Sequence, residues 1–269
     1  MKGDFHIHTT YSDGALSVEE VLTQGKKLDF ISITDHDFLQ GSFDAVALGW
    51  EKPRVIVGFE LSTEFLNESI HLLAYFPTIV GLEELNLHLQ DQRKHRLQRA
   101  FLIKDRLQEH FQINLNMDFT KQIDSITRGT IADQIIKQGY PYSREEIFKR
   151  MIGRNCPAYL PSTKLSPSQG IALIHHYGGR AVLAHPTHLK TVSVETIIAM
   201  GLDGLEAIYS QNKPDEESKF RQLALDNQLF ITAGSDFHRF NDEKHGDIGC
   251  VTLENDDLAI FLNKLGIRI

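Results

Sequence analysis

The sequence predicts an α/β fold close to a TIM-type barrel, interrupted by a helical insertion. About seven short apolar segments alternate with helical segments, and this alternation favours parallel strands joined by right-handed crossovers. From residue 80 to residue 159 the alternation stops, and polar helical segments replace it. We therefore expect a barrel domain over residues 1–79 and 160–269, with residues 80–159 forming an insertion that contributes to substrate binding.

The individual elements follow from apolar periodicity and from helix caps. Residues 17–20 form a capping box before an apolar helical stripe, and Ser166 caps a helix whose first residue is Pro167. This second helix is expected to stop at the glycine pair 178–179. The expected strands are residues 4–8, 30–34, 55–60, 70–75, 180–184, 204–209 and 230–236.

The composition is ordinary for a soluble globular protein. Of the 269 residues, 41% are apolar and 24% are charged, and the formal net charge is −8. Cys156 and Cys250 are too few for a disulfide framework, and no apolar run approaches the ~20 residues of a membrane span. An acidic chain has no general affinity for nucleic acid. We expect a cytoplasmic protein with neither DNA nor a membrane as partner. A monomer is the default expectation, since the sequence itself does not determine the oligomeric state.

The first strand carries the most informative pattern. His6 and His8 are two residues apart, so they point to the same face of a strand. Asp13 follows in a Ser-Asp-Gly turn that can fold back over the strand's end. Histidine and carboxylate side chains grouped in this way are typical of metal sites. The alternative interpretation is a buried edge strand with two incidental histidines.

Further histidines and carboxylates stand at the C-terminal ends of other expected strands, which is where the active-site residues of TIM-type barrels lie. The nine candidate ligands are His6, His8, Asp13, His36, Glu60, His71, His185, Asp236 and His238. A catalytic ion needs about three protein ligands, so this set suits two or three divalent ions, with a carboxylate such as Glu60 as a bridge. Imidazole and carboxylate ligands without thiolate favour Mn, Fe or Zn. Cations grouped in this way would attract phosphate and stabilise a leaving oxygen.

The candidate ligands stand within seven short motifs: His6-x-His8, Ser12-Asp13-Gly14, Thr34-Asp35-His36-Asp37, Gly58-Phe59-Glu60, His71 in its strand, Leu183-Ala184-His185-Pro186 and Gly234-Ser235-Asp236-Phe237-His238. These motifs resemble those of the PHP (polymerase and histidinol phosphatase) metallophosphoesterases, and they occur in that family's order across nearly the whole chain. The resemblance implies a distorted (βα)7 TIM-like barrel with a trinuclear metal site.

The same resemblance implies how the ligands are shared among three ions, with manganese the expected metal. His6, His8, Glu60 and Asp236 would hold one ion, Glu60, His71 and His185 a second, and Asp13, His36 and His238 a third. The residues of the third set are the expected catalytic residues. Asp35 and Asp37 flank a ligand and could orient it.

The central stretch is similar to the PHP branch that acts on nucleoside 3′,5′-bisphosphates and trims RNA 5′ ends. Residues 153–160 are similar to that branch's Gly-Arg-Gly-x-Pro-Ala-Tyr-Val segment. Arg128 matches an arginine that is usually followed by Pro-His, but here residues 129–130 are Gly-Thr. Because an arginine fork suits phosphate geometry, Arg99 and Arg128 are the candidate phosphate-binding residues. Solvated arginines on polar helices are the alternative.

We therefore expect a metal-dependent phosphoesterase that removes the 3′-phosphate of a nucleoside 3′,5′-bisphosphate and acts on short RNA in the 5′-3′ direction. The sequence has no Walker-type loop, nucleophile elbow or dinucleotide fingerprint to support a rival chemistry. Two alternatives stay open: a histidinol-phosphate phosphatase and a metal-binding regulatory module without turnover. His188 and His245 lie in loops near ligand positions and are candidate proton donors.

Overall fold

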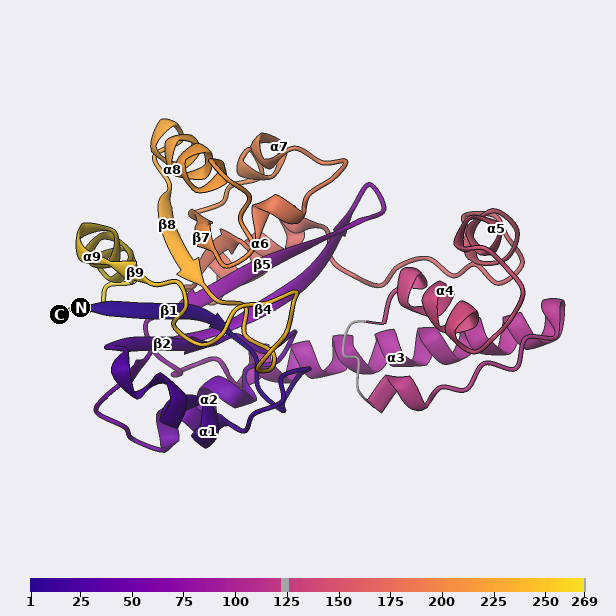
Figure 1. Ribbon diagram of the computed structural model, residues 1–269, viewed down its shortest axis with the longest axis horizontal. Helices are drawn as coiled ribbons and strands as arrows, with labels where there is room; N and C mark the ends of the chain where they lie inside the picture. Colours follow the sequence, from indigo (N-terminus) through magenta and orange to yellow (C-terminus); the bar gives the residue numbers. More distant parts are fainter. Residues whose placement is uncertain (122–125, 269) are drawn as a thin grey trace. The chain divides into compact units, whose positions relative to one another are not determined.

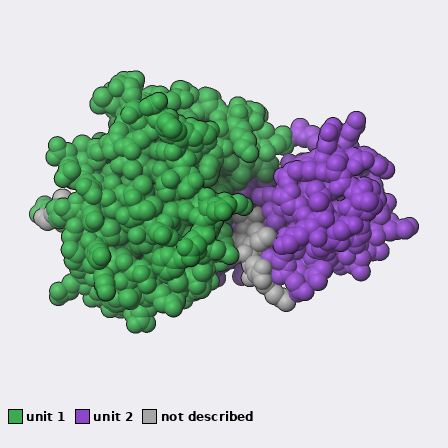
Figure 2. Space-filling model, viewed as in Figure 1, with its two compact units in different colours: residues 1–88, 165–269 green, residues 89–164 purple. Residues whose placement is uncertain are grey.

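The computed structural model describes residues 1–121 and 126–268, which form two compact units (Figures 1 and 2). Unit 1 comprises Met1–His88 and Leu165–Ile269, and unit 2 comprises Leu89–Lys164. The boundary lies within one long helix, α3 (Glu83–Phe111). Unit 1 retains the first turns of α3 because Asn86 Oδ1 accepts a hydrogen bond from the backbone nitrogen of Leu39, at 3.0 Å.

Unit 1 is a mixed α/β structure with two sheets. The first has the strand order β3-β2-β1-β9, and the second has the order β4-β5-β6-β7-β8. Their strands are β1 (Lys2–Ile7), β2 (Phe30–Ile33), β3 (Arg54–Val55), β4 (Val57–Phe65), β5 (Glu68–Phe76), β6 (Arg180–Leu183), β7 (Gly204–Tyr209), β8 (Phe230–Gly234) and β9 (Leu253–Glu254). The predicted strand over residues 55–60 is thus divided, because β3 pairs with β2 whereas β4 pairs with β5.

The expectation that all strands pair in parallel is wrong for part of the second sheet. β4 and β5 form an antiparallel hairpin, and β5 also pairs antiparallel with β6. The hairpin closes through Leu66 and Asn67, whose φ angles are +50° and +66°. Positive φ at both turn residues matches the right-handed twist of the flanking strands. The strands of the hairpin are nine residues long, so they extend beyond the predicted segments.

The expected TIM-like barrel is present only as an α/β arrangement, because the hydrogen-bonded ladders of the described strands form two open sheets rather than one closed ring. Two isolated parallel bridges connect the sheets: Ile7 pairs with Phe237, and His36 pairs with Glu60. Each bridge includes, or directly adjoins, a predicted ligand. The irregular pairing therefore coincides with the clustered histidines and carboxylates.

Three helices of unit 1, those that begin at Val18, Pro167 and Val194, start after a serine that caps them. The predicted capping box is present, since Ser17 accepts a hydrogen bond from the backbone of Glu20 while the Glu20 carboxylate accepts one from Ser17. Ser166 caps the helix that starts at Pro167, also as predicted. The helices are α1 (Val18–Gln24), α2 (Gln40–Ala47), α6 (Pro167–His176), α7 (Val194–Ile198), α8 (Glu216–Asp226) and α9 (Asn255–Lys264), with short 3-10 turns at Gly25–Lys27 and Pro186–His188.

Unit 2 has an apolar core of its own. α3 continues into it and is followed by a 3-10 turn (Asp118–Lys121), α4 (Arg128–Lys137), α5 (Arg144–Ile147) and a π-helical turn (Phe148–Ile152). Ile103, Leu107, Ile135, Ile147 and Met151 are among the fully buried residues of this core. No helix in the described part of the chain is long and apolar enough to span a membrane.

Candidate metal centre

β1 and the loop after it supply the first three residues of the site. His6 lies within β1, His8 directly follows it, and both side chains are fully buried with ring centroids 5.2 Å apart. The chain then turns back, because the backbone nitrogens of Ser12 and Gly14 both donate to the carbonyl of Thr9 at 3.0 Å. A Cβ at position 14 would collide with the backbone of His8, so only glycine permits this turn. The turn returns Asp13 to the strand's end.

Five other strands of unit 1 bring the remaining predicted residues to the same place. His36 follows β2, His185 follows β6, and Asp236 and His238 follow β8, whereas His71 lies inside β5. Glu60 was expected at the end of its strand, but it lies inside β4. The reason is that the hairpin partner extends β4 to Phe65.

Glu60 occupies the centre of this cluster. Its Oε2 atom lies 3.3 Å from His6 Nε2, 3.2 Å from His8 Nε2 and 3.0 Å from His36 Nδ1. Its Oε1 atom lies 2.9 Å from His71 Nδ1 and 3.0 Å from His185 Nε2. The two oxygens of one carboxylate therefore face two different groups of imidazoles, which is the arrangement of a bridging ligand.

Two further carboxylates complete the cluster. Asp236 Oδ1 lies 3.3 Å from Nε2 of both His6 and His8. Asp13 Oδ1 lies 3.2 Å from His238 Nε2, and Asp13 Oδ2 lies 3.8 Å from His36 Nε2. His8 also faces Asp13, so the group formed by Asp13, His36 and His238 includes His8 as well. Every one of the nine predicted ligands thus lies in this cluster.

The cluster suits divalent cations. Several buried side-chain atoms in it lack a hydrogen-bond partner among the described residues, although buried polar atoms are nearly always satisfied. These atoms are His6 Nε2, His8 Nε2, Asp13 Oδ1, His36 Nδ1 and Glu60 Oε2. They are nitrogens and oxygens of the types that Mn, Fe and Zn accept, and they point toward one another rather than to solvent.

The charges of the cluster are strongly interdependent. Burial alone would lower the pKa of His8, but its close contacts with the carboxylates of Asp236 and Glu60 outweigh burial and raise that pKa to about 10. Burial alone would raise the pKa of Glu60, whereas the surrounding imidazoles, His36 and His71 foremost, hold it well below its ordinary value. His36 differs: burial dominates and lowers its pKa to about 3. Without cations, protons on imidazoles balance the buried carboxylates.

Side chains behind the cluster fix the orientation of the ligands. Asp35 accepts hydrogen bonds from the Thr9 backbone at 2.7 Å and from the Ser12 hydroxyl at 2.6 Å. Ser12 Oγ in turn lies 3.2 Å from His8 Nδ1. Asp37 Oδ1 accepts a hydrogen bond from the backbone of Ser62 at 2.9 Å. The two aspartates beside His36 therefore hold the loop and strand around it.

Sequence reasoning missed Glu206, which lies inside β7 and is fully buried. Its Oε1 atom lies 2.9 Å from His6 Nδ1, and its Oε2 atom accepts a hydrogen bond from the backbone nitrogen of His185 at 2.6 Å. The available clue was a lone carboxylate within an apolar strand, a placement that is rare unless the charge is paired.

The two loop histidines lie against the cluster. The ring of His188 is 4.7 Å from that of His185, and burial together with that neighbour lowers the pKa of His188 to about 4. The ring of His245 stacks on His238 at 4.0 Å, and burial lowers its pKa as well. A lowered pKa leaves both rings neutral at pH 7, which does not favour either as a proton donor.

The two candidate phosphate-binding arginines belong to unit 2, whereas the cluster belongs to unit 1. Arg99 is buried, and its Nη2 atom donates to the carbonyl of Leu160 at 2.8 Å. Arg128 is the first residue of α4, and its guanidinium lies over the ring of Tyr159, 5.3 Å from the centroid.

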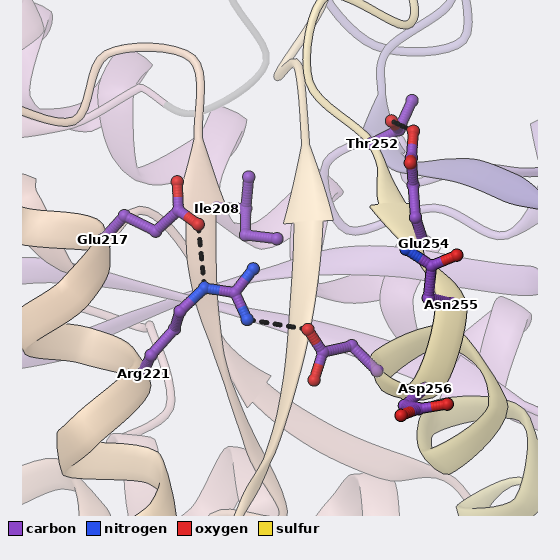
Figure 3. A pocket seen from close by; sticks show the side chains of 8 residues that line it. Ile208, Glu217, Arg221, Thr252, Glu254, Asn255 and Asp256 are labelled. Atoms are coloured by element: carbon purple, nitrogen blue, oxygen red, sulfur yellow. Dashed lines mark hydrogen bonds and ion pairs between the residues drawn. The ribbon is translucent and has the colours of Figure 1, made fainter.

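A separate pocket in unit 1 contains none of the cluster's residues (Figure 3). Its basic residue, Arg221, already donates to Glu217 at 2.8 Å and to Asp257 at 2.7 Å. Glu254 and Asp256 add further negative charge to the lining. Because its positive charge is paired and acidic groups remain, this pocket does not suit a phosphorylated substrate.

Comparison with known proteins agrees with this chemistry. A family model described as PHP domain matches residues 4–154. The 5′-3′ exoribonuclease Rnm of Escherichia coli is 31% identical over 256 residues, which cover 88% of this chain and 85% of that protein. The 3′,5′-nucleoside bisphosphate phosphatase of Chromobacterium violaceum is 25% identical over 251 residues, covering 87% and 86%. These likenesses extend over most of the chain.

The fold has a similar solved counterpart. A crystal structure from Bifidobacterium adolescentis, assigned as a metal-dependent phosphoesterase, superposes with a TM-score of 0.69 at 26% sequence identity. The match covers 97% of this chain and 96% of that one, so it includes the sequences of both units.

We predict that the metal-free protein loses stability as the pH rises from 7 toward 9. The folded pKa of His8, about 10, lies above its ordinary value of 6.5. A histidine whose pKa is higher in the folded state stabilises that state fully at pH values below its pKa in the unfolded state. This contribution is lost as the pH rises toward its pKa in the folded state. Thermal unfolding in chelator should therefore show a falling Tm. Protein saturated with Mn2+ is the control and should fall less; a Tm that rises in chelator over this interval would contradict the charge balance described above.

Proposed function

We propose that this chain, which belongs to the PHP domain family and is a metal-dependent phosphoesterase, breaks the bond between the 3′ oxygen and the phosphorus of nucleotides that carry a 5′-phosphate. The main support for this proposal is the cluster centred on Glu60, in which nine histidines and carboxylates from distant parts of unit 1 lie close together. A cluster of this kind binds cations, and grouped cations attract phosphate even in an acidic protein.

The choice of bond follows from the chemistry of the relatives' named activities. A 5′-3′ exoribonuclease that releases nucleoside 5′-monophosphates breaks the 3′ oxygen–phosphorus bond of the first nucleotide. A 3′,5′-nucleoside bisphosphate phosphatase breaks the same bond and yields the same nucleotide product. The two reactions differ only in the second substituent on phosphorus, which is RNA in one case and absent in the other. One site can therefore support both, and relatives with both names support this proposal.

We propose three ligand groups for the cluster, with Mn2+ as the metal. His6, His8, Glu60 and Asp236 form the first, Glu60, His71 and His185 the second, and Asp13, His36 and His238 the third, with His8 beside it. Bound divalent ions would polarise the phosphoryl group, make water more acidic and stabilise the leaving 3′ oxygen.

The protein's own contribution is to hold these groups in place before substrate binds. Asp35 and Ser12 fix the loop that carries Asp13, and the lowered pKa of His36 keeps its ring neutral, as ligation requires. The Asp13 side chain is partly exposed while Glu60 is fully buried. We infer that substrate approaches from the side of Asp13 and His238, which supports a catalytic role for the third group.

We further propose that Arg128 binds the 5′-phosphate. It stands at the first position of α4, where backbone N–H groups and the helix dipole also favour an anion. Arg99 and Arg106 donate to the carbonyls of Leu160 and Tyr159, and Arg128 lies over the Tyr159 ring. Arg99, expected from the sequence to bind phosphate itself, would in this proposal support the segment on which Arg128 rests.

A substrate comparison tests the proposed function. With Mn2+ present, we predict release of nucleoside 5′-monophosphate from both adenosine 3′,5′-bisphosphate and a short 5′-phosphorylated RNA. The same RNA with a 5′-hydroxyl and histidinol phosphate serve as matched controls and should react at least about tenfold more slowly, since contacts to one phosphate are lost. Chromatography of the products measures both reactions. Preference for histidinol phosphate would replace this proposal with the alternative stated from the sequence.

Removal of the third ligand group should abolish turnover without unfolding the protein. We predict that Asp13→Ala and His238→Ala each lower kcat by at least about 100-fold, the scale of losing one stabilising group in the transition state. Each variant should also bind one metal ion fewer per chain in elemental analysis. His176→Ala, an exposed histidine on α6, is the control and should leave both values unchanged. Wild-type turnover in both site variants would show that the third group is dispensable.

Arg128→Ala should weaken binding of the 5′-phosphate selectively. We predict a KM about tenfold higher or more for 5′-phosphorylated substrates, because a charged hydrogen bond is lost, and little change for 5′-hydroxyl RNA. Arg144→Ala removes an exposed arginine of α5 that pairs with Asp133 and serves as the control. Steady-state kinetics on the paired RNAs give the measurement, and an equal effect on both RNAs would argue against phosphate recognition by Arg128.

A further inference from the structure

Glu206 lies between two of the candidate metal positions without joining the ligand groups proposed above. It is fully buried in the middle of β7, and each of its carboxylate oxygens has one partner. Oε1 lies 2.9 Å from His6 Nδ1, and Oε2 accepts the backbone N–H of His185 at 2.6 Å. His6 belongs to the group around Asp236, whereas His185 faces the other oxygen of Glu60.

The contact with His6 determines which ring nitrogen can bind a cation. An ionised carboxylate only accepts hydrogen bonds, so Nδ1 of His6 must carry the proton. When a cation takes the place of the second proton, His6 Nε2 can offer its lone pair on the side of Glu60 Oε2 and Asp236 Oδ1, each 3.3 Å away. A carboxylate behind a histidine in this way fixes the tautomer and the ring orientation.

The contact with His185 supports an unusual backbone. His185 has a φ of +29°, a conformation that non-glycine residues adopt only when the surrounding structure imposes it. The Oε2 atom of Glu206 holds the N–H of that same residue, so the carboxylate fixes the backbone from which the His185 ring extends toward Glu60.

The absence of a side chain at Gly234 leaves room for the carboxylate of Glu206. A Cβ at Gly234 would collide with both Glu206 Oε1 and the Cβ of His6. Glycine at the end of β8 therefore allows the carboxylate of β7 to reach the histidine of β1. The parallel register between β7 and β8, which pairs Glu206 with Thr232 and Tyr209 with Gly234, places these residues side by side.

We propose that Glu206 is a positioning residue that prepares His6 and His185 together, and thereby couples cation binding at two positions that share Glu60. This proposal rests on the ligand groups of the proposed function, but not on the identity of the substrate. It differs from a purely structural role because the predicted loss concerns cation binding rather than folding.

Glu206→Gln tests the proposal with the shape of the side chain retained. An amide has one acceptor oxygen, whereas both partners of Glu206 are donors, so glutamine can satisfy only one of them. Its NH2 group must then face His6 Nδ1 or the N–H of His185. The first arrangement reverses the His6 tautomer and removes the lone pair from the metal side; the second releases the backbone of His185.

Asp203→Asn is a closely matched control. Asp203 precedes β7 and likewise joins a histidine side chain to a backbone N–H of β6: Oδ2 lies 2.6 Å from His175 Nε2 and accepts the backbone N–H of Ala181 at 2.9 Å. Its Oδ1 atom also accepts a hydrogen bond from Arg180 Nη1 at 3.2 Å. Asp203 lies outside the candidate metal centre. A general cost of replacing a carboxylate that joins these strands would therefore appear in both variants.

The measurement is calorimetric titration of chelator-treated protein with Mn2+ alone. We expect Glu206→Gln to weaken Mn2+ binding about 10- to 100-fold, the usual effect of losing a carboxylate behind a ligand. Asp203→Asn should match the wild type, and the rise in Tm on adding Mn2+ should shrink only in Glu206→Gln. Wild-type Mn2+ affinity in Glu206→Gln, or an equal loss in both variants, would overturn the proposal. Failure of every nucleotide substrate would instead overturn the proposed function and leave this titration interpretable.

Discussion

The structure of unit 1 depends on a group of buried carboxylates surrounded by imidazoles. Glu60 and Glu206 are fully buried and Asp236 nearly so, and the cost of burying an uncompensated charge is several kcal/mol per ion. The histidines compensate these charges by taking up protons, and cations can replace those protons. The strands around the cluster therefore hold groups that are stable together only when positive charge is present, which gives the protein its affinity for metal.

The irregular pairing of the sheets is understandable in the same terms. β1 and β8 are joined through the single bridge between Ile7 and Phe237, and β2 and β4 through the bridge between His36 and Glu60. At these positions the chain leaves the regular ladder and directs polar side chains inward. The candidate metal centre thus lies beside the two places where isolated backbone bridges join the sheets.

Much of this arrangement could be predicted from the sequence, because it depends on local patterns. The spacing of His6 and His8, the Ser-Asp-Gly turn and the residues after apolar strands are all short-range features. The family and the α/β class are confirmed by the family model and the solved relative. The antiparallel hairpin could not be read from the periodicity of β4 and β5, because an apolar strand looks the same in either pairing direction.

Glu206 was missed for a related reason. Its two partners are 200 and 21 positions away in the chain, and no spacing rule connects them. The division between the units lies within α3, which crosses it without a break in helical periodicity. Sequence patterns therefore identified side chains that the fold brings together in the cluster, while the position of Glu206 behind them depends on register between strands.

The interrupted course of unit 1 has a consequence for how the protein is made. His6 and His8 emerge from the ribosome long before Asp236 and His238, and the whole of unit 2 is synthesised in between. Since unit 2 has an apolar core of its own, it can fold before residues 165–269 of unit 1 have been synthesised. The cluster can therefore be completed only after Asp236 and His238 have been synthesised, so His6 and His8 lack part of their surrounding residues until the end of translation.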